Sequence, residues 1–251
     1  TISHDIVGIS QRPLRATVGN PWYSYYVLKT NGIFQSQEEI NNYKWTDPNT
    51  GLTNLIQPNA KPGDLRYVDF NNDGKINSDD NQYMGSYMPK ITFGFGGNLN
   101  YKNLDFSFQF QGVGKSTIYN AFKQMTLTGR QQGGNMLKDI LNAWDYNHTS
   151  GIPRLALVDD PNGNYTNPSD FYLEDGSYLR LKNLTLGYTL PQQWLNALGL
   201  KKSTLRLYFN CENLFTITDY TGIDPEVGNF GLDGGVYPVA RSFTRGFNFG
   251  F

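Results

Sequence analysis

The chain has 251 residues, and its 21 Lys and Arg against 22 Asp and Glu give a formal net charge of −1. This balance argues against a nucleic-acid-binding protein, which normally carries a basic excess. Aromatic residues make up 15% of the chain and Gly occurs 27 times, which favours β-structure with many turns. Cys211 is the single cysteine, and His4 and His148 are the two histidines. An intrachain disulfide, a thiolate cluster and a multi-histidine metal site are therefore excluded.

Five segments carry weaker structural patterns. Residues 22–30 and 116–125 are candidate strands. Residues 38–43 are a candidate turn of helix, residues 135–144 have apolar side chains at helical spacing, and residues 191–198 begin with proline, as many helices do. We expect the three helices to pack loops rather than to bind a ligand.

The most specific local motif lies in residues 69–80, which we call the aspartate loop. Oxygen-bearing side chains stand at positions 1, 3, 5, 9 and 12, with glycine at position 6. This is the order of an EF-hand calcium loop, except that aspartate replaces glutamate at position 12. The alternative is an Asx-rich turn without an ion. The predicted ligands of a structural Ca²⁺ are Asp69, Asn71, Asp73, the carbonyl of Lys75, Asn77 and Asp80.

Period-two alternation is strongest in residues 91–111. Apolar side chains occupy alternate positions from Ile91 to Tyr101, with glycine at one of them, and again from Leu104 to Phe110. Lys102 and Asn103 separate the two runs. Two alternating runs joined by two turn-type residues predict a β-hairpin.

Residues 184–190, 205–211 and 243–251 alternate in the same way, which brings the expected total to about seven strands. Several are longer than the usual ~5–6 residues and match the ~9–11 residues of a transmembrane strand. One face consists of Phe, Leu and Tyr, and the other of Gly, Ser, Thr, Asn and Gln. Short and long connections also alternate. We therefore predict an all-β fold whose antiparallel strands belong to a transmembrane β-barrel.

Several ordered motifs resemble the C-terminal barrel region of SusC/RagA-like transporters, which are TonB-dependent outer-membrane proteins of Bacteroidetes-type Gram-negative bacteria. They lie in residues 31–40, 63–76, 84–90, 151–154, 177–191 and 212–215. The terminal pattern Arg245-Gly246-x-x-Phe249-x-Phe251 is similar to the signal by which outer-membrane barrels are recognised for insertion. On that resemblance we expect Phe251 to be the native chain end.

The resemblance implies that residues 1–251 are the C-terminal part of a barrel of about 22 strands with long extracellular loops. The remaining strands, the plug and the segment that contacts TonB would come from the same protein or another chain, because open sheet edges are not tolerated in hydrocarbon. It further implies a place in the cell outer membrane, in contact with its lipid, and a SusD-like surface lipoprotein as partner.

The implied activity is import of a large nutrient, with glycan oligosaccharides as the first expectation and oligopeptides as the alternative. Tyr165, Tyr172 and Tyr237 are candidates for stacking on sugar rings, although loop packing is the more frequent role of such residues. A different class, a soluble calcium-stabilised carbohydrate-binding β-module, explains the aromatic content but not the two faces of the long strands. The sequence shows no nucleophile constellation or carboxylate pair, so we do not expect an enzyme.

Overall fold

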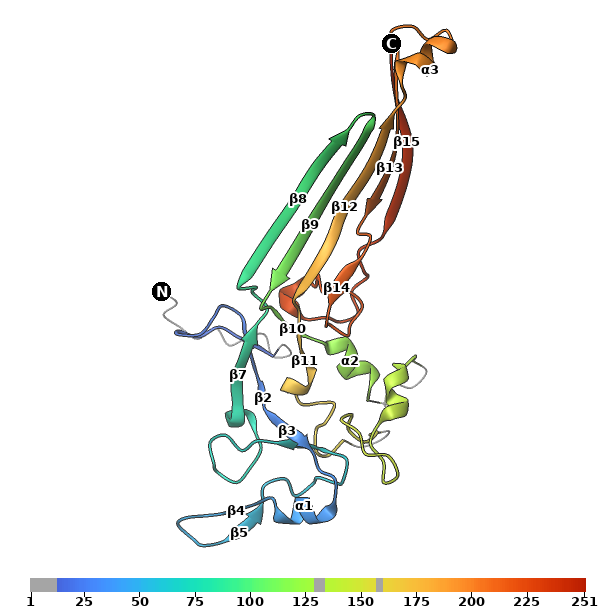
Figure 1. The fold of residues 1–251 in the computed structure, drawn as a ribbon. Helices are drawn as coiled ribbons and strands as arrows, with labels where there is room; N and C mark the ends of the chain where they lie inside the picture. Colours follow the sequence, from blue (N-terminus) through green and yellow to red (C-terminus); the bar gives the residue numbers. More distant parts are fainter. Residues whose placement is uncertain (1–12, 129–133, 157–159) are drawn as a thin grey trace. The chain divides into compact units, whose positions relative to one another are not determined.

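The computed structural model describes residues 13–128, 134–156 and 160–251 (Figure 1). They form two compact units, each assembled from separate stretches of the chain. We call one the strand unit, made of Pro89–Ser116, Asp175–Glu226 and Val236–Phe251. We call the other the loop unit, which comprises the described residues within Thr1–Met88, Thr117–Glu174 and Val227–Gly235.

The strand unit is one antiparallel sheet with the order β15-β13-β12-β9-β8, and the short β14 pairs with β12 beside this path. Its strands are β8 (Ile91–Tyr101), β9 (Leu104–Gly114), β12 (Tyr178–Thr189), β13 (Thr204–Glu212), β14 (Thr216–Thr218) and β15 (Ser242–Gly250). The predicted hairpin is confirmed, and Lys102 takes a left-handed φ of 53° in its turn. Helix α3 (Gln192–Ala197) connects β12 to β13, as the proline at position 191 predicted.

Apolar side chains align across the whole sheet because the register keeps them opposite one another. Leu99 lies opposite Phe106, Phe106 opposite Leu186, and Leu186 opposite Phe209. Directly opposite residues share a face, so one face of the sheet is continuous. We call it the apolar face; its members include Ile91, Phe93, Phe95, Leu99, Tyr101, Leu104, Phe106, Phe108, Phe110, Leu184, Leu186, Tyr188, Leu205, Leu207, Phe209, Phe243, Phe247 and Phe249. The opposite, polar face carries mainly Asn, Thr, Ser, Gln and Gly, together with a few charged residues that include Asp105 and Arg206.

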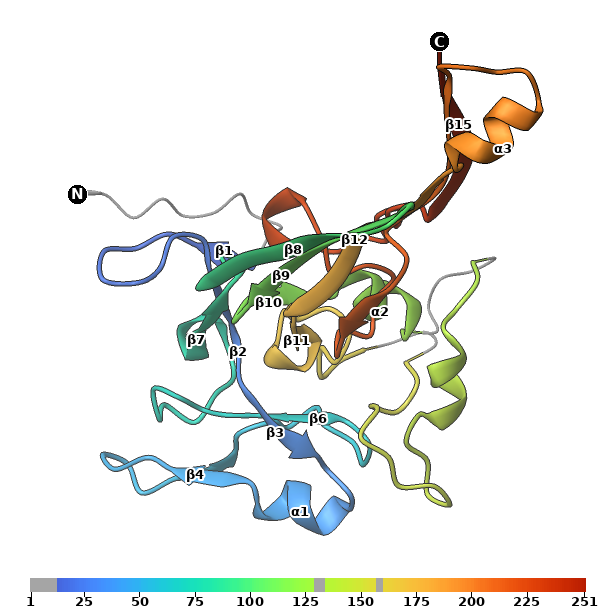
Figure 2. The same ribbon diagram turned by 45° about the horizontal axis from the view of Figure 1, so that its top comes forward.

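The loop unit consists of short elements. Its strands are β1 (Leu14–Arg15), β2 (Ser24–Leu28), β3 (Thr30–Ile33), β4 (Lys44–Thr46), β5 (Thr53–Leu55), β6 (Leu65–Tyr67), β7 (Asn81–Ser86), β10 (Thr117–Tyr119) and β11 (Leu173–Asp175). Its helices are α1 (Gln37–Asn42), α2 (Ala121–Thr126) and the 3₁₀ turns η1 (Ser78–Asp80), η2 (Lys138–Asn142), η3 (Asp170–Tyr172) and η4 (Asn229–Gly231). β1, β2 and β7 form one small sheet, and α1 lies beside the β4–β5 hairpin (Figure 2).

Buried tyrosines hold the loop unit together. The hydroxyl of Tyr25 donates to the carbonyl of Gly231 at 2.9 Å, and that of Tyr67 to the carbonyl of Gly163 at 2.8 Å. Burial raises the pKa of both hydroxyls, so both remain protonated donors. A buried tyrosine thus supplies apolar area and satisfies a loop carbonyl at the same time.

Two of the weaker predictions are wrong in part. Residues 116–125 form a strand only over β10, because the Asn120 side chain then accepts the N–H of Lys123 and starts helix α2. The expected helix in residues 135–144 is only the 3₁₀ turn η2, which has no side-chain cap, and Leu141 on it is 77% exposed. A short helix that has no cap and leaves such a side chain exposed gains too little from packing to be stable.

The predictions for residues 22–30 and 38–43 agree more closely with the structure. Residues 22–30 contain β2 and the start of β3, and residues 38–43 fall on α1, where the Ser36 hydroxyl accepts the N–H of Glu39 as N-cap. Among the described residues, no helix is long and apolar enough to cross a membrane.

Candidate functional site

The aspartate loop connects β6 to β7 and is organised by its own side chains. The carboxylate of Asp69 accepts the N–H groups of Asp73 and Gly74, at 3.1 and 2.8 Å. The side chains of Asn71 and Asp73 accept the N–H groups two residues further on, of Asp73 and Lys75, both at 3.0 Å. These are Asx turns, which short polar side chains form readily.

Asp80 closes the loop from its far end. Its carboxylate is fully buried and accepts the N–H of Phe70 at 2.9 Å and that of Asn77 at 2.8 Å. The Asn77 side chain in turn accepts the N–H of Asp79, so the two residues form a capping box around η1. The structure therefore brings the Asp80 carboxylate back to Phe70, at the start of the loop.

Gly74 permits the sharp turn in the middle of the aspartate loop. Its φ is +80°, and a Cβ there would collide with the indole of Trp45. In the described part of the chain, no three His, Cys, Asp or Glu side chains are grouped so that they could hold a metal ion. The calcium site stays a prediction, with Asp69, Asp73 and Asp80 held by backbone donors in this conformation.

A second arrangement of charge lies on the polar face of the strand unit. The Arg206 guanidinium on β13 reaches across β12 to Asp105 on β9, with Nε–Oδ1 at 2.8 Å and Nη2–Oδ2 at 2.5 Å. Gly187 lies on β12 between them, directly opposite Asp105, and a Cβ at Gly187 would overlap both charged groups. The missing side chain makes this ion pair possible. Sequence reasoning missed it because the pairing depends on the register of three strands.

A third group of charges attaches the long connection between β14 and β15 to the sheet. Arg180 on β12, with a side chain only 3% exposed, contacts Asp224 at 2.5 Å and Glu226 at 2.7 Å. Its Nε donates to the hydroxyl of Thr216 at 2.7 Å, and Lys182 reaches Glu226 at 2.8 Å. Two carboxylates and a hydroxyl thus compensate one buried guanidinium.

Asp224 in this group remains ionised. Burial on its own raises the pKa of this carboxyl, but the N–H groups of Glu226 and Val239 and the Arg180 guanidinium lower it by more, so that the pKa lies below its usual value. The negative charge that holds the connection is therefore present down to acidic pH.

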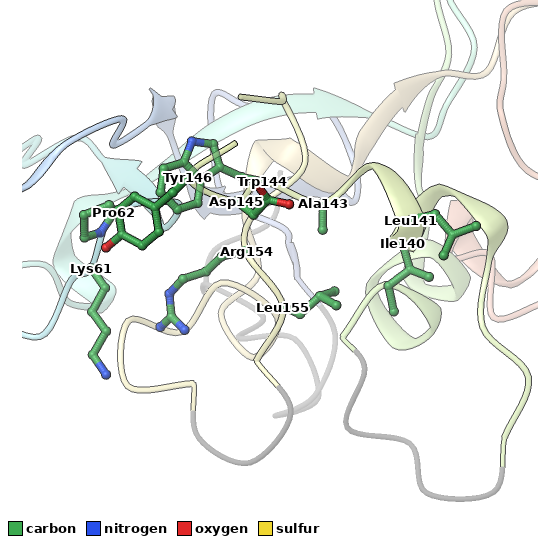
Figure 3. A pocket seen from close by; sticks show the side chains of 10 residues that line it. All are labelled: Lys61, Pro62, Ile140, Leu141, Ala143, Trp144, Asp145, Tyr146, Arg154 and Leu155. Carbon is green, nitrogen blue, oxygen red and sulfur yellow. The ribbon is translucent and has the colours of Figure 1, made fainter. Parts of the chain in front are cut away.

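The loop unit also contains a surface groove of about 590 Å³ (Figure 3). Its lining residues are Lys61, Pro62, Ile140, Leu141, Ala143, Trp144, Asp145, Tyr146, Arg154 and Leu155. The Trp144 indole donates to Gln35 at 2.8 Å, and Arg154 forms an ion pair with the buried Asp64 at 2.6 Å. Both are structural contacts, which leaves the 81% exposed ring of Tyr146 as the accessible aromatic surface.

The three tyrosines considered for sugar stacking differ in exposure. Tyr165 and Tyr172 are buried, and their hydroxyls donate to the carbonyls of Pro153 and Asn164. They pack loops. Tyr237 is 88% exposed, so its ring is accessible.

No family model matches the chain. It is similar to TonB-dependent receptors P26 and P3 of Formosa agariphila, each at 36% identity, over 94% and 79% of this chain and 23% and 20% of those proteins. It is also similar to TonB-dependent receptor SusC of Bacteroides thetaiotaomicron, at 31% identity over 78% of this chain and 18% of that receptor. The chain therefore spans about a fifth of the length of these relatives.

Solved structures agree with these relatives. The RagAB peptide importer in its closed-closed state aligns with a TM-score of 0.68 and 26% identity, over 95% of this chain and 24% of that one. A structure of the RagAB peptide transporter aligns with a TM-score of 0.67 and 25% identity over the same share of each chain. The all-β prediction and the resemblance stated from the motifs are both confirmed.

Proposed function

We propose that this chain, which belongs to the SusC/RagA-like TonB-dependent receptors and is the C-terminal barrel region of one, forms part of the wall of a channel that imports a large nutrient. The protein lies in the bacterial outer membrane. Its relatives are named as receptors and importers, which favours transport over catalysis.

The observation that carries the proposal is the contrast between the two faces of the strand unit. Large apolar side chains are exposed on one face, for example Phe95, Leu99 and Phe247 at 51%, 63% and 68%. A soluble module would bury such a face, whereas a barrel strand turns it to lipid and its polar face to an aqueous lumen. The apolar face is therefore the lipid surface of this proposal, and the polar face is the wall of the channel.

The sheet supports one further partner of the chain, which is the rest of the receptor. Its described strands end at β8 and β15, which have no further partner in the strand unit. Because a membrane does not tolerate open sheet edges, the remaining strands come from the rest of the receptor. The lumen of a barrel of about 22 strands needs a plug, and we propose that the rest of the receptor supplies it. A SusD-like lipoprotein is the proposed surface partner, and TonB contacts the plug-bearing part of the receptor.

The proposed substrate is a glycan oligosaccharide. The likeness to the RagAB peptide importer favours an oligopeptide as the second candidate. The test is uptake of labelled oligosaccharides and oligopeptides of graded length by cells that carry the full receptor or lack it. Uptake of one class that requires both the receptor and the membrane potential supports import. Equal uptake with and without the receptor for both classes contradicts it.

We also propose a structural Ca²⁺ in the aspartate loop. The support is the order of its oxygen side chains, the left-handed turn at Gly74 and the self-repulsion of Asp69, Asp73 and Asp80, which Lys75 offsets only in part. A bound ion would have oxygen ligands at about 2.3–2.6 Å.

The test is calcium titration of the full receptor with protease protection of the loop as the readout. Asp73→Ala removes a proposed ligand, and Asp79→Ala, which removes the same charge at a position outside the ligand set, is the matched control. Calcium should protect the loop in the control but not in Asp73→Ala. Identical protection with calcium and with chelator means that the motif is a hydrogen-bonded turn.

A further inference from the structure

One charged residue lies on the apolar face of the strand unit. Arg245 on β15 is directly opposite Phe209 on β13, and Phe243 and Phe247 flank it on the same face of its own strand. At every other register position of this face in the described strands the residue is uncharged. A guanidinium facing hydrocarbon is costly, so its presence calls for a partner.

The described residues offer Arg245 none. Its side chain is exposed, and no ion pair joins it to another described residue. By contrast, Arg180 and Arg206 on the polar face are each paired with carboxylates. The partner of Arg245 therefore comes from outside the strand unit.

The depth of Arg245 in the membrane indicates which partner. It is three residues inside the Ser242 end of β15, about 10 Å along the strand. That end follows the long connection from β14 and is therefore the extracellular one. With a strand tilt of about 45° the depth below the outer end is ~7 Å, and a long cationic side chain snorkels over such a distance to the polar boundary.

We propose that Arg245 anchors a binding site for a phosphate-bearing lipid of the outer leaflet. The planar guanidinium fork matches the geometry of a phosphate group. Phe209, Phe243 and Phe247 are 45%, 61% and 68% exposed around it and provide the apolar surface for the acyl chains. The site rests on the outer-membrane location alone and is independent of what the receptor imports.

A competing partner is a carboxylate on the strand that closes the barrel next to β15. The two cases differ in their consequences. Loss of a lipid contact weakens lipid binding and leaves the lipid-free barrel as stable as before. Loss of a carboxylate partner leaves an unpaired charge in the wall and lowers the stability of the barrel in every lipid.

The experiment is native mass spectrometry of the full receptor in detergent, titrated with phosphatidic acid or, for comparison, with phosphatidylcholine. Arg245→Gln should weaken retention of phosphatidic acid about tenfold, the equivalent of one charged hydrogen bond, while Arg245→Lys should weaken it less. Lys201→Gln, which removes an exposed cation at the opposite end of the strands, should retain the lipid as the unchanged receptor does.

Thermal unfolding of the same variants in lipid-free detergent completes the test. We expect Arg245→Gln to unfold at the temperature of the unchanged receptor, because the lipid contact is absent from both. Unaltered phosphatidic acid retention in Arg245→Gln would overturn the proposal. So would a lowered unfolding temperature without lipid, since that result assigns Arg245 to a carboxylate in the barrel wall.

Discussion

Gly187 offers a sharp test of the register of the strand unit. Asp105 and Arg206 meet across β12 only because Gly187 has no side chain, and a Cβ there would overlap both partners. We therefore predict that Gly187→Ala separates the ion pair. In an ordinary strand position the same substitution stabilises, because alanine loses less backbone freedom on folding than glycine does.

The two effects have opposite signs and similar sizes. A fully exposed ion pair stabilises a protein by ~0.2–1 kcal/mol. The side chains of Arg206 and Asp105 are 28% and 31% exposed, so this pair contributes more stability than an exposed pair and less than a buried one. Its two-point geometry raises the loss to about 1–2 kcal/mol. The alanine gain in a strand is about 0.5–1 kcal/mol. Subtracting this gain from the loss leaves a net destabilisation for Gly187→Ala of about 0–1.5 kcal/mol, centred on about 0.8 kcal/mol.

The assay is guanidinium unfolding of the full receptor, followed by tryptophan fluorescence, with and without Asp105→Ala. Once Asp105 is gone, only the alanine gain remains, and Gly187→Ala should stabilise by about 0.5–1 kcal/mol. Gly114→Ala is the matched control, because its Cβ would make only an ordinary 3.6 Å contact with Ile91. An equal effect of Gly187→Ala in both backgrounds would refute the dependence of the ion pair on Gly187.

Three further predictions concern other surfaces. Phe108→Arg should cost ~2–4 kcal/mol if the residue lies near the bilayer midplane, and it should reduce the amount of folded receptor in the outer membrane. Gln109→Arg on the polar face should leave this amount unchanged. Equal amounts of both variants would count against the lipid assignment. Gly63→Ala, at a φ of +91° against the Trp144 ring, should cost roughly 1–3 kcal/mol and expose the loop unit to protease, and unchanged protection would contradict this. Because folding lowers the pKa of Asp224, the stabilisation that its carboxylate provides is complete above the unfolded pKa of about 3.9 and is lost as the pH falls through the folded pKa. Protease cleavage of the connection between β14 and β15 should then rise. It should not rise in Asp224→Asn, which lacks the titrating group.

The long strands were predictable because each carries its signal locally. Alternation from Ile91 to Tyr101 identifies both the strand and the face that each side chain occupies. The register between strands is a long-range property, so neither the Asp105–Arg206 pair nor the isolation of Arg245 is visible until the strands are aligned.

The loop unit was less predictable for a related reason. The apolar spacing in residues 135–144 is helical, but the segment lacks a cap and a surface to cover Leu141. The aspartate loop was the exception, since its turn depends on Gly74 and on Asx side chains only a few residues away. Whether an ion joins those side chains depends on their convergence, which spacing alone does not determine.

The bond from Tyr25 to the carbonyl of Gly231 has a consequence for the order of folding. It joins residues 206 positions apart, and such distant contacts form slowly because a long stretch of chain must first be brought together. Tyr25 is fully buried, so its surroundings are completed only when the connection after β14 has been made. The residues that surround Tyr25 therefore remain unpacked until the residues near Gly231 have been synthesised, and chaperones and proteases can act on them during this interval.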